Sequence, residues 1–144
     1  MNNKKSNICS FEDLKVWKYA RKIQQEVAKL VKRFPKEEKY RLTDQMIRSS
    51  RSVSRNIAEG YGRYHYQENI QFCRQSRGSL SELKNELYTA YEEKYISKEK
   101  LNKMRERVEE YNRLLNGYIR YLKKAKKEFK TQEPDLIYEA DPCN

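Results

Sequence analysis

Apolar residues recur along this chain at alternating steps of three and four, the spacing of one face of an α-helix. In the first such stretch the apolar positions are Val16, Ala20, Ile23, Val27, Leu30 and Phe34. Ser10, followed three residues later by Asp13, resembles a capping box at the start of this helix. Because the residue before a proline avoids the helical conformation, Pro35 predicts that the helix ends near Arg33 or Phe34.

The second predicted helix covers about residues 42–59 and has two opposed faces. Its core face is predicted to contain Met46, Ser50, Val53 and Ile57, and its opposite face Arg48, Arg51 and Arg55. A residue as small as Ser50 would allow a neighbouring helix to approach closely. Gly60 is predicted to end the helix in the left-handed conformation, which glycine adopts without a Cβ clash.

Two longer helices are predicted, over about residues 66–94 and 98–126. The apolar seam of the third helix consists of Ile70, Cys73, Ser76, Leu80, Leu83, Leu87 and Ala90. That of the fourth consists of Leu101, Met104, Val108, Tyr111, Leu115, Tyr118 and Leu122. Gly78 interrupts the third helix at a cost of about 1 kcal/mol relative to alanine, which close helix packing would explain. Ser97 is a suitable N-cap for the fourth helix.

Four amphipathic helices joined by short loops predict an all-α fold, an up-down-up-down antiparallel four-helix bundle. The length of 144 residues fits one domain. We expect the bundle to span residues 11–128, preceded by a disordered N-terminus over residues 1–10. Residues 129–144, which contain prolines and several acids, are predicted to form a disordered acidic tail that is solvated or folds back on a basic face.

Charge narrows the range of partners. The chain contains 32 Lys and Arg against 21 Asp and Glu, a net charge of +11. Residues 131–144 contain four of the acids and no base, so the preceding part of the chain carries a net charge of +15. A domain this basic attracts nucleic acid, an acidic protein or an anionic membrane surface, although a solvated basic surface without a specific partner is the alternative.

Several classes of chemistry find no support in the sequence. The three cysteines include no CxxC pair and His65 is the only histidine, so we expect neither a zinc site nor any other cofactor. No nucleophile motif, Gly-rich phosphate loop or metal-spaced acid cluster occurs, and we expect no enzymatic activity. No secretory signal or long apolar run is present, which favours a cytoplasmic protein without a membrane partner.

Several short motifs carry a family resemblance over about residues 11–124. They are Phe11-Glu12-Asp13-Leu14 with Val16-Trp17, Phe34-Pro35, Arg41-Leu42-Thr43 with Gln45 and Arg48, Asn56-Ile57-Ala58-Glu59-Gly60 with Arg63, and Gly78-Ser79 with Glu82. Together they resemble the four-helix bundle proteins encoded in intervening sequences of bacterial 23S ribosomal RNA genes. One departure is Ser54, where that family usually has proline, and serine should leave the helix straighter.

The resemblance implies a homopentamer and an association with ribosomal RNA. It also implies kinship with accessory proteins of diversity-generating retroelements, which work with a reverse transcriptase and its template RNA. We therefore expect a non-catalytic, oligomeric RNA-binding protein, associated with ribosomal intervening sequences or acting as an accessory factor to a retroelement reverse transcriptase. The alternative is a protein-interaction scaffold whose basic surface docks an acidic protein.

Candidate functional residues follow from charge and spacing. The expected nucleic-acid contacts are Arg51, Arg55, Arg63, Tyr64, Arg120, Lys123, Lys124 and Lys127. Structural or inter-subunit polar roles are expected for Arg48, Asn56, Glu59, Glu82 and Glu86. Glu59 and Arg63 are spaced for an ion pair along one helix, whereas Glu82 and Glu86 are candidate partners for the arginines across helices or subunits. Trp17 is either a core residue or an oligomer contact.

Overall fold

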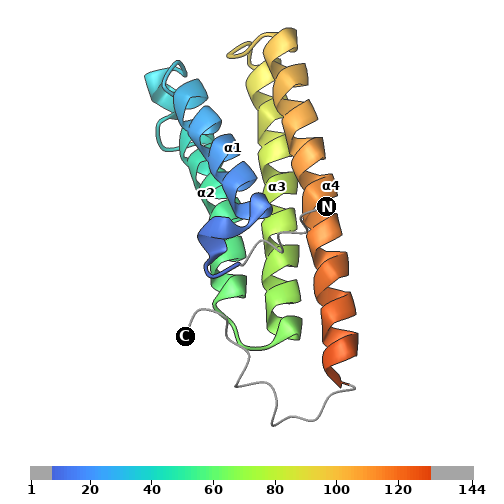
Figure 1. Ribbon diagram of the computed structural model, residues 1–144. Coiled ribbons are helices and arrows are strands. Elements are labelled where there is room, and N and C mark those ends of the chain that lie inside the picture. The colour runs from blue at the N-terminus through green and yellow to red at the C-terminus, as the bar shows by residue number, and fades with distance from the viewer. Residues whose placement is uncertain (1–7, 131–144) are drawn as a thin grey trace.

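The computed structural model describes residues 8–130, and over this range the chain is helical without a β-strand. Of the segments predicted to be disordered, residues 1–10 and 129–144, the parts 1–7 and 131–144 lie outside the described residues. Two short 3-10 helices and four α-helices follow one another in Figure 1: η1 (Phe11–Asp13), α1 (Lys15–Val31), η2 (Lys36–Glu38), α2 (Leu42–Tyr61), α3 (Tyr66–Glu92) and α4 (Lys98–Lys130). The predicted all-helical four-helix fold is confirmed.

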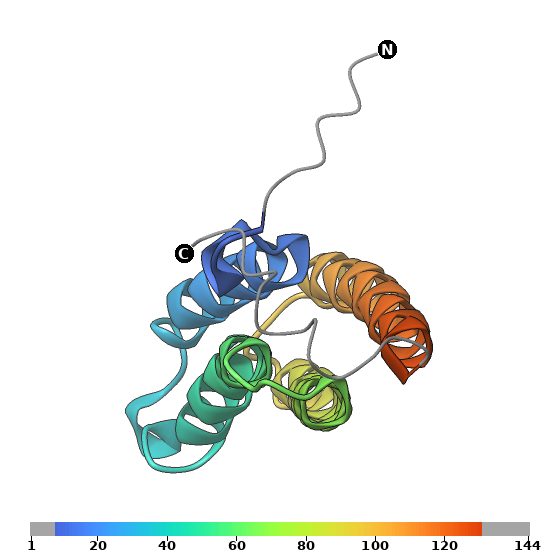
Figure 2. The ribbon, with the colours of Figure 1, turned by 60° about the horizontal axis from the view of Figure 1, so that its bottom comes forward.

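The four α-helices surround one core. Each packs against its neighbour along the chain, α1 on α2, α2 on α3 and α3 on α4. A smaller contact between α1 and α4 completes the ring, which can be followed in the tilted view of Figure 2. This arrangement leaves the outer face of every helix available for charged side chains.

The predicted apolar seams form the core. All five seam positions within α1, all four of α2 and all seven of α3 are buried. The sixth predicted position of the first seam, Phe34, is buried too, but α1 ends before it at Val31. In α4 the seam is buried except at Tyr118, which is half-buried. The ring of Tyr118 packs against the core, and its hydroxyl accepts a hydrogen bond from Asn69 Nδ2 of α3 at 3.4 Å. Cys73 is buried in the core and behaves as a small apolar side chain.

The helix ends differ in detail from the prediction. The capping box lies at the start of η1 rather than of α1. Its Asp13 Oδ2 accepts a hydrogen bond from the Ser10 backbone N–H at 3.1 Å. Leu14 is extended, and only then does α1 begin. Ser97 does cap α4, since its hydroxyl accepts a hydrogen bond from the Lys100 N–H at 3.1 Å. α4 continues through Lys130, so residues 129 and 130 belong to the bundle rather than to the predicted tail.

The prediction for Gly60 is wrong in its mechanism. Gly60 lies inside α2, and among the described residues no glycine has a positive φ. It is buried instead, and a Cβ there would lie 2.7 Å from Asn69 Oδ1 and 2.9 Å from Phe72 Cβ. Glycine is needed because α3 passes this close. α2 ends at Tyr61, and Gly62, the C-cap residue, has an ordinary φ of −72°.

Close packing of another helix against Gly78, which would explain this glycine, is not found among the described residues. Gly78 is exposed, and a Cβ at this position would meet no atom of the described residues within 4 Å. By contrast, the predicted close approach at Ser50 fits its burial, and its hydroxyl donates to the Ile47 carbonyl at 3.1 Å. Ser54 is buried where the resembling family usually has proline, and its hydroxyl donates to Gln24 Oε1 at 2.9 Å. α2 is therefore continuous there and linked to α1.

Candidate nucleic-acid interface

We call Arg48, Arg51, Arg55 and Arg63 the arginine row, because all four are exposed along α2 and the turn after it. The side chains of Arg51 and Arg55 make neither an ion pair nor a hydrogen bond with any residue in the described part of the chain. Arg48 instead pairs with Asp44 of the same helix, with 3.2 Å between Nε and Oδ2. Among the described residues Arg48 therefore pairs within its own helix and not across helices, and its inter-subunit role stays a prediction. A carboxylate one turn away is already within reach, so pairing there requires less ordering of the side chains.

The two acids expected to meet the arginines have other surroundings. Glu86 is half-buried, and its Oε2 accepts a hydrogen bond from the Ser49 hydroxyl at 2.7 Å. Burial raises the pKa of Glu86 above its ordinary value of 4.5, and repulsion from Glu82 adds to this, whereas the hydrogen bond from Ser49 opposes it. Glu82 is exposed, and within residues 8–130 it forms no ion pair. Their pairing with arginines of another subunit stays a prediction.

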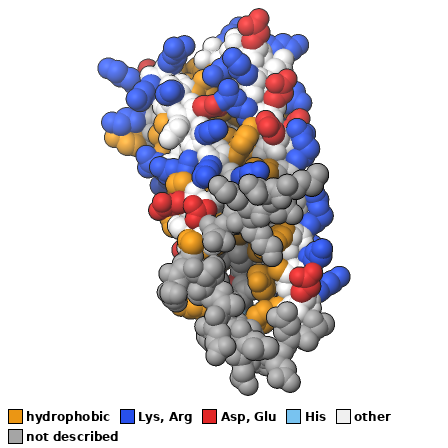
Figure 3. Space-filling model, viewed as in Figure 1, with side chains coloured by type: hydrophobic (Ala, Val, Ile, Leu, Met, Phe, Trp, Pro, Cys, Tyr) orange, Lys and Arg blue, Asp and Glu red, His pale blue; other side chains and the backbone are white. Residues whose placement is uncertain are grey.

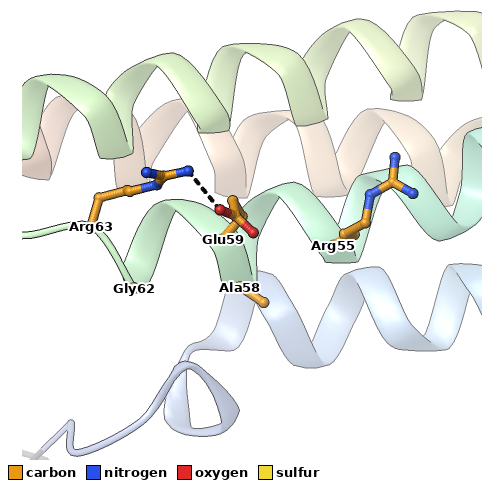
Figure 4. Close-up of a pocket in the computed structure, with 5 residues that line it drawn as sticks. All are labelled: Arg55, Ala58, Glu59, Gly62 and Arg63. Atoms are coloured by element: carbon orange, nitrogen blue, oxygen red, sulfur yellow. Dashed lines mark hydrogen bonds and ion pairs between the residues drawn. The ribbon is translucent and has the colours of Figure 1, made fainter.

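Arg55 and Arg63 lie on either side of an open concavity of about 500 Å³, which is also lined by Ala58, Glu59 and Gly62 (Figure 4). Arg63 turns back toward Glu59, with 2.7 Å between Nη2 and Oε1, as expected from the i,i+4 spacing. Both side chains of this pair are nearly half exposed. An exposed ion pair of this kind contributes at most about 1 kcal/mol, so an incoming phosphate can compete with Glu59 for Arg63.

The tyrosines in and around the turn between α2 and α3 differ in how far they are buried. Tyr61 and Tyr66 are partly buried and pack against the core. The ring of Tyr66 also meets Phe129 of α4 edge to face, with 5.7 Å between centroids. Tyr64 is 94% exposed, so its ring faces solvent and is available for stacking on a base.

Asn56 acts inside the bundle. It is buried, and its Nδ2 donates to the Ser52 carbonyl at 2.8 Å and to the Ser52 hydroxyl at 3.0 Å. The Ser52 hydroxyl is in turn 2.8 Å from that of Ser79 on α3. This chain of hydrogen bonds connects α2 with α3 directly behind the arginine row.

A second basic surface lies at the end of α4. The side chains of Arg120, Lys123, Lys124 and Lys127 are exposed, and none of them pairs with a carboxylate of the described residues. Two of them, Lys123 and Lys127, line a groove of about 330 Å³ between α3 and α4. We call this the lysine groove, and its lining residues are Gln67, Ile70, Arg74, Lys123, Lys126, Lys127 and Lys130.

Sequence reasoning did not assign a binding role to Gln67, Arg74, Lys126 or Lys130. A signal for them is present, since positions 67, 70 and 74 share one face of α3, and positions 123, 126, 127 and 130 share one face of α4. What the sequence does not show is that these two faces meet. That juxtaposition depends on how α3 and α4 are packed.

Basic side chains are spread widely over the visible surface. In Figure 3, Lys and Arg side chains follow the edge formed by α4 and cover much of the area over α1, with acidic side chains scattered among them. Across residues 8–130 no group of three His, Cys, Asp or Glu is placed to hold a metal ion. Over the same range no helix has the length and apolarity to span a membrane. The exposed lysines and arginines are groups that attract anions.

Comparison with known protein families places the chain beside proteins with a known genetic context. A family model described as 23S rRNA-intervening sequence protein matches residues 12–117, which include the arginine row and most of the bundle. No curated protein matches the chain.

Proposed function

Since the chain belongs to the 23S rRNA-intervening sequence protein family, we propose that it is a non-catalytic protein that binds RNA through its basic surfaces. The family name, which refers to ribosomal RNA, is consistent with this role without specifying the ligand. The RNA is that of a ribosomal intervening sequence or of a retroelement that encodes a reverse transcriptase. The protein works without a cofactor, in the cytoplasm.

The observation that carries the proposal is the set of exposed cations that have no carboxylate partner. Within residues 8–130, the ion pairs engage Arg48, Arg63, Lys84, Arg105 and Arg107. Arg51, Arg55 and the basic end of α4 are outside this set. Guanidinium and ammonium groups held apart from carboxylates can each neutralise a phosphate, and the counterions that they release favour binding.

The proposed assembly is a homopentamer of up-down-up-down bundles. The chain reverses direction at each short connection between the helices in Figure 1, which supports this order. Gly78 supports contact with another subunit, because a glycine in the middle of a helix costs about 1 kcal/mol relative to alanine and no residue of the range 8–130 lies close to it. A ring would repeat each basic surface and strengthen binding to a long polyanion.

The proposal is tested by reversing charge in the arginine row. An Arg51→Glu/Arg55→Glu double variant should lose at least about tenfold in RNA affinity, while its circular dichroism spectrum remains helical. An Arg33→Glu/Lys36→Glu variant makes the same change in net charge near the opposite end of α2 and serves as the control. Equal affinities for the wild type and the Arg51/Arg55 variant would remove this surface from the proposal.

A second candidate function is a scaffold that docks an acidic protein. The mixed charges on α2, where Arg48 pairs with Asp44 and Arg63 with Glu59, favour it because such pairs can rearrange against a folded partner. Affinity capture from a lysate after nuclease treatment separates the two functions. A defined acidic protein that is retained after digestion of all RNA would support the scaffold, and its loss on digestion would support RNA binding.

A further inference from the structure

The lysine groove is built from two facing helical stripes. α3 contributes Gln67, Ile70 and Arg74, and α4 contributes Lys123, Lys126, Lys127 and Lys130. The α4 stripe runs from Lys123 to Lys130, a distance of about 10 Å along the helix axis. The volume of the groove, about 330 Å³, is within the range of small-ligand sites. The groove therefore has the length and the depth to hold a short stretch of an extended chain.

The charge of the groove is unbalanced. None of its five cations pairs with a carboxylate in the part of the chain that the structure describes, and only Lys126 has a side-chain partner, the neutral Gln67 Oε1 to which it donates. Like charges one turn apart on a helix repel by a few tenths of a kcal/mol per pair. The negative end of the α4 dipole offsets part of this repulsion. A bound polyanion would offset the rest.

The shape of the groove favours one form of polyanion. Arg74 lines the α3 side of the groove and the lysines line the α4 side. A phosphate must therefore enter the groove to contact both sides. A groove of about 330 Å³ has room for a short stretch of one strand, whereas a duplex is too large to enter it and would meet only its rim. The floor of the groove contains Ile70, and the lysine stems add methylene groups against which a base can lie.

An aromatic side chain lies close to the groove. Tyr64 precedes the first residue of α3 by two positions, and Gln67, the first lining residue, is only three positions after Tyr64. The ring is 94% exposed. Sites for single strands combine a positive groove that follows the backbone with exposed rings on which bases stack. The groove and Tyr64 together supply both parts.

We propose that the lysine groove holds a single strand of RNA, with phosphates between Arg74 and the α4 lysines and a base stacked on Tyr64 beside the entrance. This inference rests on the proposed RNA-binding function and specifies the form of RNA that is bound. It also assigns binding roles to Arg74, Lys126 and Lys130. The groove is separate from the arginine row, which can contact a phosphate backbone of either form.

The first test compares a labelled 12-nucleotide single-stranded RNA with the same strand annealed to its complement. The wild type should bind the single strand at least about tenfold more tightly than the duplex. A Lys126→Glu/Lys130→Glu variant should lose this preference while retaining most of its duplex affinity. A Lys100→Glu/Lys103→Glu variant makes the same charge change near the other end of α4 and should keep the preference.

A second variant separates stacking from charge. Tyr64→Ala should weaken single-strand binding by about fivefold or more, since a base stacked on an aromatic ring contributes about 1–3 kcal/mol. Tyr40→Ala is the matched control, because Tyr40 is 83% exposed near the opposite end of α2 and should leave binding unchanged.

Two results would overturn the inference while leaving RNA binding intact. They are equal affinity of the wild type for the single strand and the duplex, and a single-strand preference that survives in the Lys126/Lys130 variant. Absence of binding to either RNA would overturn the proposed function as well.

Discussion

Gly60 of α2 lies directly against Asn69 of α3, since a Cβ at Gly60 would be 2.7 Å from Asn69 Oδ1. This close approach occurs where the chain turns from α2 into α3. The same turn carries Arg63, whose guanidinium lies 5.0 Å from the centre of the Phe72 ring, and the exposed Tyr64. A packing contact inside the bundle thus positions two candidate RNA contacts on its surface.

Replacing Gly60 by alanine should destabilise the bundle. The new methyl group would overlap both Asn69 Oδ1 and Phe72 Cβ, and separating the helices to admit it should cost about 1–3 kcal/mol. Urea unfolding followed by circular dichroism measures the difference. Gly117→Ala is the control, because among residues 8–130 a Cβ there would meet only Arg120 Nη2, at an ordinary contact distance of 3.7 Å. It should stabilise α4 by about 0.5–1 kcal/mol, and a Gly60 variant as stable as the wild type would refute the packing argument.

Ser76 and Tyr111 should show coupled effects on stability. The Ser76 hydroxyl donates to the Val53 carbonyl at 2.8 Å and lies 3.2 Å from the hydroxyl of Tyr111, which is fully buried. Ser76→Ala would leave that hydroxyl unpaired in the core and should cost about 1–3 kcal/mol. Adding Tyr111→Phe removes the unpaired group, so the double variant should be more stable than the sum of the single effects. Strict additivity in the unfolding free energies would show that the two hydroxyls do not interact.

The raised pKa of Glu86 predicts a specific pH dependence. Burial favours the protonated carboxyl in the folded state, so the native protein binds more protons than the unfolded chain between the ordinary pKa of 4.5 and the higher folded value. Stability therefore falls as pH rises through this window. Glu86→Gln keeps an acceptor for Ser49 without the charge, and the variant should be more stable than the wild type at pH 7.

That advantage of Glu86→Gln should shrink as the pH is lowered to about 4, because the wild-type carboxyl is then protonated too. Glu82→Gln provides the exposed control, with a smaller change at either pH. Unfolding free energies from urea titrations at several pH values test this. A Glu86→Gln variant that is less stable than the wild type at pH 7 would show that the hydrogen bond from Ser49 outweighs the effect of burial.

The periodicity of apolar residues predicted the fold well because each seam depends only on neighbours within one helix. Helix ends are harder to predict from the sequence. A glycine such as Gly60 is compatible both with the end of a helix and with a close approach of a neighbouring helix. Only the packing of Asn69 of α3 against Gly60 shows that close approach is the reason for the glycine. The lysine groove could not be predicted from the sequence either, because it also depends on how two helices pack. Ile70 and Lys126 belong to separate periodic patterns, and only the packing of α3 on α4 brings them to one groove.

The salt dependence of RNA binding tests the central claim most directly. Fluorescence anisotropy of a labelled RNA, titrated with the nuclease-treated wild-type protein at several KCl concentrations, gives the association constant at each. Its logarithm should fall linearly with the logarithm of salt concentration, with a slope of about −3 or steeper. That slope corresponds to at least about four phosphate contacts at about −0.7 each on a single strand. A slope near zero, or no binding at the lowest salt concentration, would contradict the proposal that exposed cations of this bundle bind RNA.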